Sequence, residues 1–314
     1  MFFSELKSKV DEDISILVKL DNHSASYLCE CGDASLLSVK DCQQIEVVFI
    51  SHTHIDHFIN FDTLLRHQIG SEKRVTIIGP NGILAQTQSK IRGYSWNLIE
   101  EGAITYEIRE IVNENLVRIY EVNPPTWDIK QIGELTDNLI FENERFEVSF
   151  TILNHKIDSI AYLFKERDTI NIDIAKSGFK GGAWVKELKQ AYLNGEEALN
   201  IRIDNKVYIA ADLFNLIVPK KGNTLGIIMD HAVNADNHIK IKSLFSKCDK
   251  VFIESFYKQD DFHAAEQNFH SYSTASGKIM KECGVKDAIP VHFSRKYNSI
   301  QIAELIEEFK VEFH

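Results

Sequence analysis

The stretch Ser51-His52-Thr53-His54-Ile55-Asp56-His57 follows directly on an apolar run at residues 45–50. Four of its seven side chains are of the kinds that bind metal ions. In an extended segment the first two histidines point to the same side, whereas the aspartate and the last histidine point elsewhere as the chain turns. A strand that ends in such a cluster presents ligands at its C-terminal edge, a common place for active sites in α/β folds. The stretch therefore predicts a metal site, with one ion for each pair of ligands.

The alternative interpretation of this stretch is an ordinary surface loop rich in His and Asp. The chain has 12 histidines in 314 residues, so three within six residues are a rare coincidence. This density favours the metal site over the surface loop.

The composition is that of an average soluble globular protein. The chain has a mass of 36.0 kDa and 44% hydrophobic residues, which suggests two domains or one large one. No apolar run reaches the 18 residues of a transmembrane helix, and the charged N-terminal stretch is not a secretory signal. Five cysteines, an odd number, indicate free thiols. We therefore expect a cytoplasmic protein without disulfides.

The net charge is acidic, at -11. A nucleic-acid binder usually carries a basic patch, so this balance argues against one unless basic residues gather locally.

Short β-branched runs alternate with segments of helical periodicity, which indicates an α/β architecture. Strands are expected at residues 14–20, 45–50, 75–78, 148–153, 160–164, 207–210, 226–229 and 251–253, with more at 104–122. Helices are expected at residues 61–67, 182–193, 239–245, 273–283 and 299–309.

Further polar residues stand at the ends of expected strands, namely His155, Asp212 and His292. Singly, each is more often a structural histidine or a turn aspartate. Together with the first cluster they form a constellation of nitrogen and oxygen ligands without thiolate. Zn²⁺ suits that set, with Mn²⁺ as the alternative.

The pattern His-x-His-x-Asp-His at a strand end resembles the signature of the metallo-β-lactamase superfamily. Later segments resemble motifs of its ribonuclease Z branch, in the right order and over residues 27 to 300. These segments are Glu30-Cys-Gly-Asp-Ala-Ser35, Thr151-Ile-Leu-Asn-His155, Tyr208-Ile-Ala-Ala-Asp212, Ile253-Glu-Ser-Phe256, Phe269-His-Ser271 and His292-Phe-Ser-Arg-Lys-Tyr297. In the family, a threonine stands at the end of the element that Phe256 ends here.

The resemblance implies an αββα sandwich of two mixed sheets flanked by helices. It implies a single domain over 1–314, with a short arm-like insertion near 165–199. Two zinc ions are expected, the first bound by His52, His54 and His155, the second by Asp56, His57 and His292, with Asp212 bridging both. The stretch between Asp212 and Glu254 is longer than the resemblance leads us to expect. Asp212→Ala should lose both metals or nearly all activity.

The resemblance also implies catalytic roles. Asp56 accepts a proton from the nucleophile, His270 donates one to the leaving oxygen, and Glu254 orients His270. The reaction implied is 3′-end cleavage of precursor tRNA through a metal-bridging hydroxide, and dimerisation is implied by family analogy.

The segment Ser177–Trp184 resembles the tip of the tRNA-gripping arm of that family, without its prolines. Lys176, Lys180, Lys186 and Lys189 make it locally basic, and a solvated helix face explains them equally well. We expect Lys180, Trp184, Ser294 and Arg295 to bind substrate.

Three other functions compete with an endoribonuclease. A hydrolase of the same fold that acts on a small ester, lactone, thioester or cyclic nucleotide is favoured by the short arm and the acidic charge. A diiron reductase of the same fold is disfavoured, because it usually has a carboxylate in place of His54 and carries a flavin domain. A non-catalytic module is disfavoured by the complete ligand set.

Overall fold

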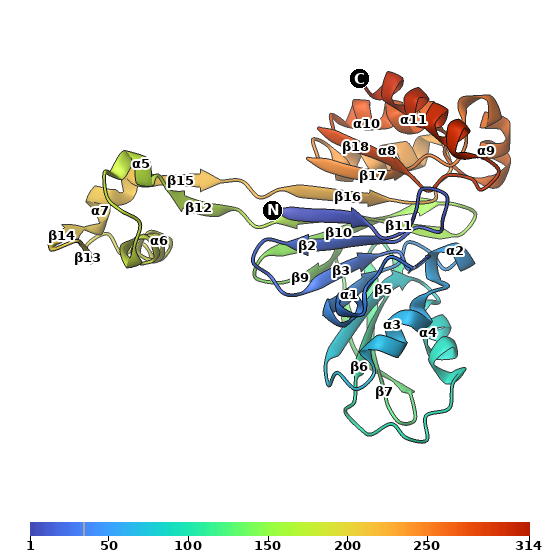
Figure 1. Cartoon of the computed structure of the whole chain (residues 1–314), viewed down its shortest axis with the longest axis horizontal. Helices are drawn as coiled ribbons and strands as arrows, with labels where there is room; N and C mark the ends of the chain where they lie inside the picture. Colours follow the sequence, from blue (N-terminus) through green and yellow to red (C-terminus); the bar gives the residue numbers. More distant parts are fainter. Residues whose placement is uncertain (34) are drawn as a thin grey trace. The chain divides into compact units, whose positions relative to one another are not determined.

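The computed structural model describes residues 1–33 and 35–314, so Ala34 of the loop at 30–35 lies outside the described residues. The chain divides into two compact units (Figure 1). Unit 1 comprises Met1–Lys165 and Asn223–His314, and unit 2 comprises Glu166–Gly222. Unit 2 thus ends later than the insertion predicted near 165–199. The reason is that its last strand, β15 (Ile217–Lys220), pairs antiparallel with its first, β12 (Thr169–Ile172).

The first sheet of unit 1 has eight strands in sequence order. They are β1 (Phe2–Leu6), β2 (Ile16–Leu20), β3 (Ser26–Cys29), β4 (Ile45–Phe49), β5 (Arg74–Pro80), β6 (Thr105–Asn113), β7 (Leu116–Asn123) and β8 (Asp128–Leu135). Strands β3 to β6 are parallel neighbours, whereas both margins of the sheet are antiparallel. The sheet is therefore mixed, with parallel strands at its centre.

The second sheet has the order β18-β17-β16-β11-β10-β9. Its strands are β9 (Leu139–Glu142), β10 (Phe146–Asn154), β11 (Asp158–Glu166), β16 (Thr224–Ile228), β17 (Lys250–Glu254) and β18 (Asp287–Val291). Strands β16, β17 and β18 run parallel, and β11 pairs with β16 antiparallel. The C-terminal ends of β16 to β18 therefore share one edge.

The two sheets share a core of large side chains that alternate along their strands. Tyr27 and Phe49 come from the first sheet, and Phe146, Tyr162 and Phe252 from the second. The central strands bury their other face under helices, because successive side chains of a strand point to opposite faces. The arrangement is the predicted αββα sandwich.

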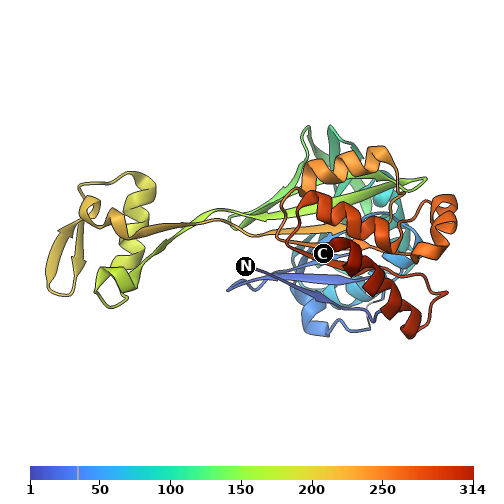
Figure 2. The same ribbon diagram turned by 90° about the horizontal axis from the view of Figure 1, so that it is seen from above.

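The helices of unit 1 form two outer layers (Figures 1 and 2). The first sheet is covered by the helices α1 (Val39–Gln44), α2 (Ile55–Phe58), α3 (Phe61–Gln68) and α4 (Ile83–Arg92). The second sheet is covered by α8 (Ala235–Phe245), α10 (Ser273–Cys283) and α11 (Ser299–Phe313). A shorter helix, α9 (Phe262–Asn268), precedes α10 in the chain. Within the described residues, no helix has the length and apolar character that crossing a membrane requires.

Unit 2 has a small core of its own. It contains α5 (Ile174–Ser177), α6 (Ala183–Asn194), α7 (Ala210–Leu213) and a hairpin of β13 (Asn200–Ile203) with β14 (Lys206–Ile209). Trp184, Leu188 and Ile201 are among the side chains buried together there.

Candidate metal centre

Three groups of side chains in unit 1 have ligand atoms within 4.8 Å of one another. They are His52, His54, His155 and Asp230; Asp56, His57 and His292; and Asp230, Glu254 and His270. Most of these residues stand at or just after the ends of β4, β10, β16, β17 and β18, whereas His270 follows α9. The two predicted histidine sets are therefore brought together, at one edge of the sandwich, as parallel strand ends require.

Asp230 lies between the two histidine sets, with its side chain 2% exposed. Its Oδ2 is 3.4 Å from His155 Nε2 and 3.7 Å from His52 Nε2. Its Oδ1 is 3.1 Å from His292 Nδ1 and 3.4 Å from His57 Nε2. Each carboxylate oxygen thus faces one set, which is the geometry of a ligand shared by two cations.

Asp212, the bridging ligand expected from the sequence, is not in these groups. It lies in the first turn of α7 in unit 2, where its side chain is exposed. The prediction of Asp212 was wrong because an apolar run followed by Asp occurs twice, and β16 is the run whose end meets the histidines. The unexpectedly long spacing between Asp212 and Glu254 was the sequence signal for this error, since Asp230 stands 18 residues nearer to Glu254.

The side chains present fit a pair of metal ions. In the described residues, His57 Nε2, His292 Nδ1 and Asp230 Oδ1 are buried without a hydrogen-bond partner. Buried polar atoms are rarely left unpaired, and three that converge are typical of atoms that hold a cation. Imidazole and carboxylate donors without thiolate suit zinc or manganese.

The carboxylates make the centre strongly attractive to positive charge. Burial alone would lower the pKa of His292, but Asp230, Asp56 and Glu254 raise that pKa to about 10. Burial is likewise outweighed at His57, where Asp230 and Glu30 raise the pKa well above its ordinary value. At neutral pH these two histidines therefore hold protons that a metal ion must displace.

His57 and His155 are each oriented by a second partner. The Glu30 carboxylate is 2.9 Å from His57 Nδ1, and its other oxygen accepts from the Ser51 backbone N–H at 2.9 Å. His155 Nδ1 donates to the Phe269 carbonyl at 2.7 Å. Such partners fix which ring nitrogen is left for the metal. Sequence reasoning missed Glu30, although it stands in a loop whose motif had been recognised.

Gly32 allows that loop to approach the metal-binding turn. A Cβ on Gly32 would lie 2.3 Å from the Asp56 carbonyl oxygen and 2.7 Å from that of Ile14. The backbone N–H of Cys31 donates to the His57 carbonyl at 2.9 Å. The absence of a side chain at residue 32 thus sets the position of Asp56 and His57.

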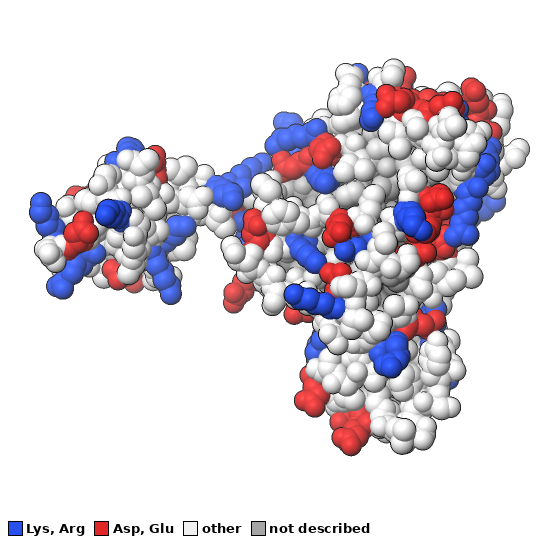
Figure 3. All heavy atoms as spheres, viewed as in Figure 1, with Lys and Arg blue, Asp and Glu red and all other residues white. Residues whose placement is uncertain are grey.

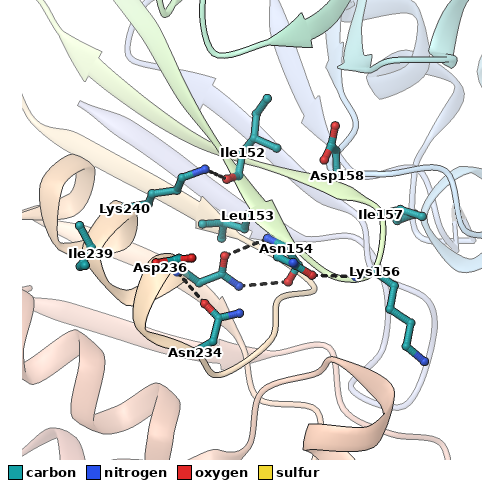
Figure 4. Close-up of a pocket in the computed structure, with 11 residues that line it drawn as sticks. Ile152, Leu153, Asn154, Lys156, Ile157, Asp158, Asn234, Asp236, Ile239 and Lys240 are labelled. Atoms are coloured by element: carbon teal, nitrogen blue, oxygen red, sulfur yellow. Dashed lines mark hydrogen bonds between the residues drawn. The ribbon is translucent and has the colours of Figure 1, made fainter.

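Asn237 joins the two loops that carry His155 and Asp230. Its Oδ1 accepts from the Asn154 N–H at 2.8 Å, and its Nδ2 donates to the carbonyls of Asn154 at 3.0 Å and Ala232 at 2.8 Å. Two of the dashed lines at Asn154 in Figure 4 mark its bonds to Asn237, beside a pocket of about 450 Å³. Asn237 is itself 2% exposed, and no sequence pattern indicated its role.

His270 and Glu254 form a buried pair next to Asp230. Nδ1 of His270 is hydrogen-bonded to Oε1 of Glu254, while the backbone N–H groups of Ser271 and His231 donate to Oε2 at 3.0 and 3.2 Å. Burial would lower the pKa of His270, but Glu254 raises it above its ordinary value. Glu254 therefore favours the protonated imidazole, the form that a proton donor requires.

A pocket of about 460 Å³ opens beside Asp56 and His292. Ser294 and Arg295, both expected to bind substrate, line it together with Phe256. The Arg295 guanidinium is exposed and paired with Asp13. The pocket joins the candidate metal centre to solvent on the side of these two residues.

The two expected substrate-binding residues of unit 2 differ in exposure. Lys180 is exposed. Trp184 is only 4% exposed, and its indole N–H donates to the Lys180 carbonyl at 2.9 Å. A buried ring has no free face for a base, so the prediction of Trp184 as a substrate contact was wrong. Trp184 instead packs from helix α6 into the core of unit 2.

Comparisons with known proteins support the resemblance. No family model matches the chain. The chain is 24% identical to Ribonuclease Z of Anoxybacillus flavithermus over 304 residues, which cover 94% of this chain and 85% of that protein. The solved structure of the short form of human tRNase Z has a TM-score of 0.55 at 17% identity and covers 90% of this chain and 86% of its own.

A metallo-β-lactamase fold protein of Bacillus subtilis has a TM-score of 0.54 at 15% identity, with 96% of this chain and 86% of its own covered. The predicted fold is confirmed by these two structures. The chain thus has the metallo-β-lactamase fold and is similar, over nearly its whole length, to proteins named ribonuclease Z.

Proposed function

We propose that this chain is a metal-dependent endoribonuclease that removes the 3′ trailer of precursor tRNA. The observation that carries the proposal is one buried carboxylate, Asp230, with each oxygen facing a separate set of histidines. The relatives are named ribonuclease Z, and this name supports the class of substrate, which the geometry alone does not identify. Two Zn²⁺ are the proposed cofactors, with Mn²⁺ as the alternative. Their proposed ligands are His52, His54, Asp56, His57, His155, Asp230 and His292.

When bound, such a metal pair lowers the pKa of water and neutralises charge that develops on the phosphoryl oxygens. The protein's own groups then move the protons. The Asp56 carboxylate, whose pKa is held below its ordinary value against burial by His292 and His57, accepts a proton from the attacking water. His270 donates its Nε2 proton to the leaving 3′ oxygen, while Glu254 accepts the hydrogen bond from Nδ1. The products are a 3′-hydroxyl and a 5′-phosphate.

Cations near the pocket would bind the flanking phosphates. Arg295 is paired with Asp13, and Lys296 lies 2.8 Å from Asp261, so a phosphate would compete with these carboxylates. Ser294 adds a hydroxyl at the same wall. Exposed ion pairs contribute little stability, which makes such an exchange of partners inexpensive.

Unit 2 is the proposed tRNA grip. It has nine Lys and Arg against eight Asp and Glu, so the acidic excess of the chain lies in unit 1. Several of its Lys and Arg side chains are on the surface seen in Figure 3. A segment without acidic excess can approach phosphates that the rest of the chain repels. The nine are Arg167, Lys176, Lys180, Lys186, Lys189, Arg202, Lys206, Lys220 and Lys221.

One observation favours a second candidate. The pocket of about 460 Å³ is of the size that takes a small ligand, such as an ester or a cyclic nucleotide.

A cytoplasmic location and a homodimer complete the proposal. The five free and buried cysteines support a reducing compartment.

The test is cleavage of a 5′-labelled precursor tRNA with a 3′ trailer by the zinc-loaded protein. A single cut at the acceptor-stem boundary, absent with Asp230→Ala and retained with Asp212→Ala, supports the proposal. If protein that carries two metals hydrolyses an aryl phosphodiester but leaves the tRNA intact, the tRNA substrate is wrong and the small-molecule candidate replaces it.

A further inference from the structure

Phe256 is an aromatic side chain of the pocket wall that contacts the proposed proton donor, His270. It stands two residues after Glu254, where the resembled motif ends in threonine. It is partly exposed, and its carbonyl accepts from the Ser294 backbone N–H at 3.0 Å. The backbone of Phe256 is therefore held in place, while part of the residue is left for other contacts.

The ring of Phe256 is stacked on the imidazole of His270. The centroids are 3.9 Å apart and the planes differ by 8°. Glu254 holds the edge of the same imidazole through Nδ1. The His270 backbone N–H donates to the Ala265 carbonyl at 3.0 Å, which fixes the main chain. The hydrogen bond to Glu254 thus restricts rotation of the imidazole in its plane, and the stacked phenyl ring of Phe256 restricts its tilt out of that plane.

The same phenyl ring faces the pocket beside Asp56 and His292, with Ile55 and Ile59 as further apolar walls. The ring centroid of His292 is 5.2 Å from that of Phe256. A substituent that enters the pocket therefore meets the phenyl ring, which covers one face of His270.

We propose that Phe256 is a positioning residue that sets the ring plane of His270 so that its Nε2–H is aligned with the leaving oxygen. The inference rests on the proposed role of His270. In the step concerned, the oxygen of the attacking water bonds to phosphorus and its proton passes to Asp56, while the bond from phosphorus to the leaving oxygen breaks and the His270 Nε2 proton moves to that oxygen. The imidazole then regains a proton from water. Misalignment of the ring slows this transfer and leaves attack on phosphorus unchanged.

Leaving-group dependence tests the inference without reliance on tRNA. The substrates are two thymidine 5′-aryl phosphodiesters, one that releases p-nitrophenolate, which needs no proton, and one that releases phenolate, which does. Phe256→Ala should lower kcat for the phenyl ester roughly 10- to 100-fold, the range for groups that orient a catalytic side chain. Its kcat for the nitrophenyl ester should stay within about threefold, and both KM values should change little.

The second measurement is a double-mutant cycle with His270→Ala. His270→Ala should show the same preference for the nitrophenyl ester, and Phe256→Ala should add nothing in that background. Phe256→Trp should retain the wild-type ratio. Phe262→Ala is the matched control, since Phe262 lies 3.8 Å from His263, and it should leave both rates unchanged.

Two results overturn the inference alone. In the first, Phe256→Ala slows both esters equally with loss of metal. In the second, its effect adds in full to that of His270→Ala. If His270→Ala itself slows both esters equally, the proposed role of His270 fails and the inference fails with it.

Discussion

Two aspartates of this chain follow apolar strands and have opposite surroundings. Asp212 comes after β14, an exposed strand of a two-stranded hairpin in unit 2. Asp230 comes after β16, a buried strand between β11 and β17 in unit 1. The end of β16 meets the ends of neighbouring strands, whereas β14 has a single partner. The comparison teaches that a ligand is made by the neighbours of its strand and only secondarily by its local sequence.

The largest expected effect separates these two aspartates. Asp230→Ala should lose metal and reduce activity roughly 10³-fold or more, because His57 and His292 lose the carboxylate they share. Asp212→Ala should retain both metals and full activity. Metal content by elemental analysis and turnover of an aryl phosphodiester check both variants. Loss of metal in Asp212→Ala would reverse the comparison and restore the assignment made from sequence.

A second pair of residues repeats the comparison with the same chemistry. His270 is paired with the buried Glu254, and His263 lies 3.6 Å from Glu266 on the surface. His270→Ala should retain metal and lose about 10²–10⁴-fold in rate, since a general acid is removed. The rate should also fall as pH rises through the raised pKa of His270. His263→Ala should match the wild type in a pH–rate profile.

Zinc loss from His270→Ala in elemental analysis would show that His270 is a ligand and not a proton donor.

The sequence predicted many of the buried strands of unit 1 and the histidines near their ends, because those strands are runs of apolar and β-branched residues, although the equally buried β3 was missed. Apolar runs at 148–153 and 251–253 became β10 and β17, with His155 and Glu254 at the expected ends. The exposed strands β8 and β12 were missed, since their faces carry little hydrophobic pattern. Asp230 and Asn237 were missed because their roles depend on contacts with distant segments. The role of Trp184 was misjudged because local sequence does not report which side of α6 is covered.

A third pair lies on α8. Asn237→Ala should weaken zinc binding about 10- to 100-fold, because the loops of His155 and Asp230 lose their shared hydrogen bonds. Asn234→Ala removes only the helix cap and should cost about 1 kcal/mol of unfolding free energy. Chelator competition measures the first effect and urea denaturation the second. Equal zinc affinity in the two variants would mean that Asn237 is merely structural.

Proton release on metal binding also distinguishes the two units. Unit 2 contains no histidine, so any imidazole protons come from unit 1. The raised pKa values of His57 and His292 mean that both are protonated in metal-free protein at neutral pH. Zinc affinity should therefore rise with pH, by about tenfold per unit for each proton released. In the metal-free protein, the His292 proton contributes stability below its ordinary pKa that is lost as pH rises through about 10.

Calorimetry in two buffers of different ionisation enthalpy counts the protons. A zinc affinity that does not change between pH 6.5 and 9 would contradict the raised pKa values.

The smallest effect concerns the charges of unit 2. Lys180 is exposed, so a phosphate contact there acts through water and is screened by salt. Lys180→Ala should raise KM for precursor tRNA about threefold and reduce the salt slope of log kcat/KM by about 1. Hydrolysis of an aryl phosphodiester should be unchanged, because that substrate is too short to reach beyond the pocket. Lys310→Ala, which removes an exposed lysine paired with Glu307 in unit 1, is the control. An unchanged salt slope in Lys180→Ala would remove Lys180 from the proposed grip and leave the chemistry of unit 1 untouched.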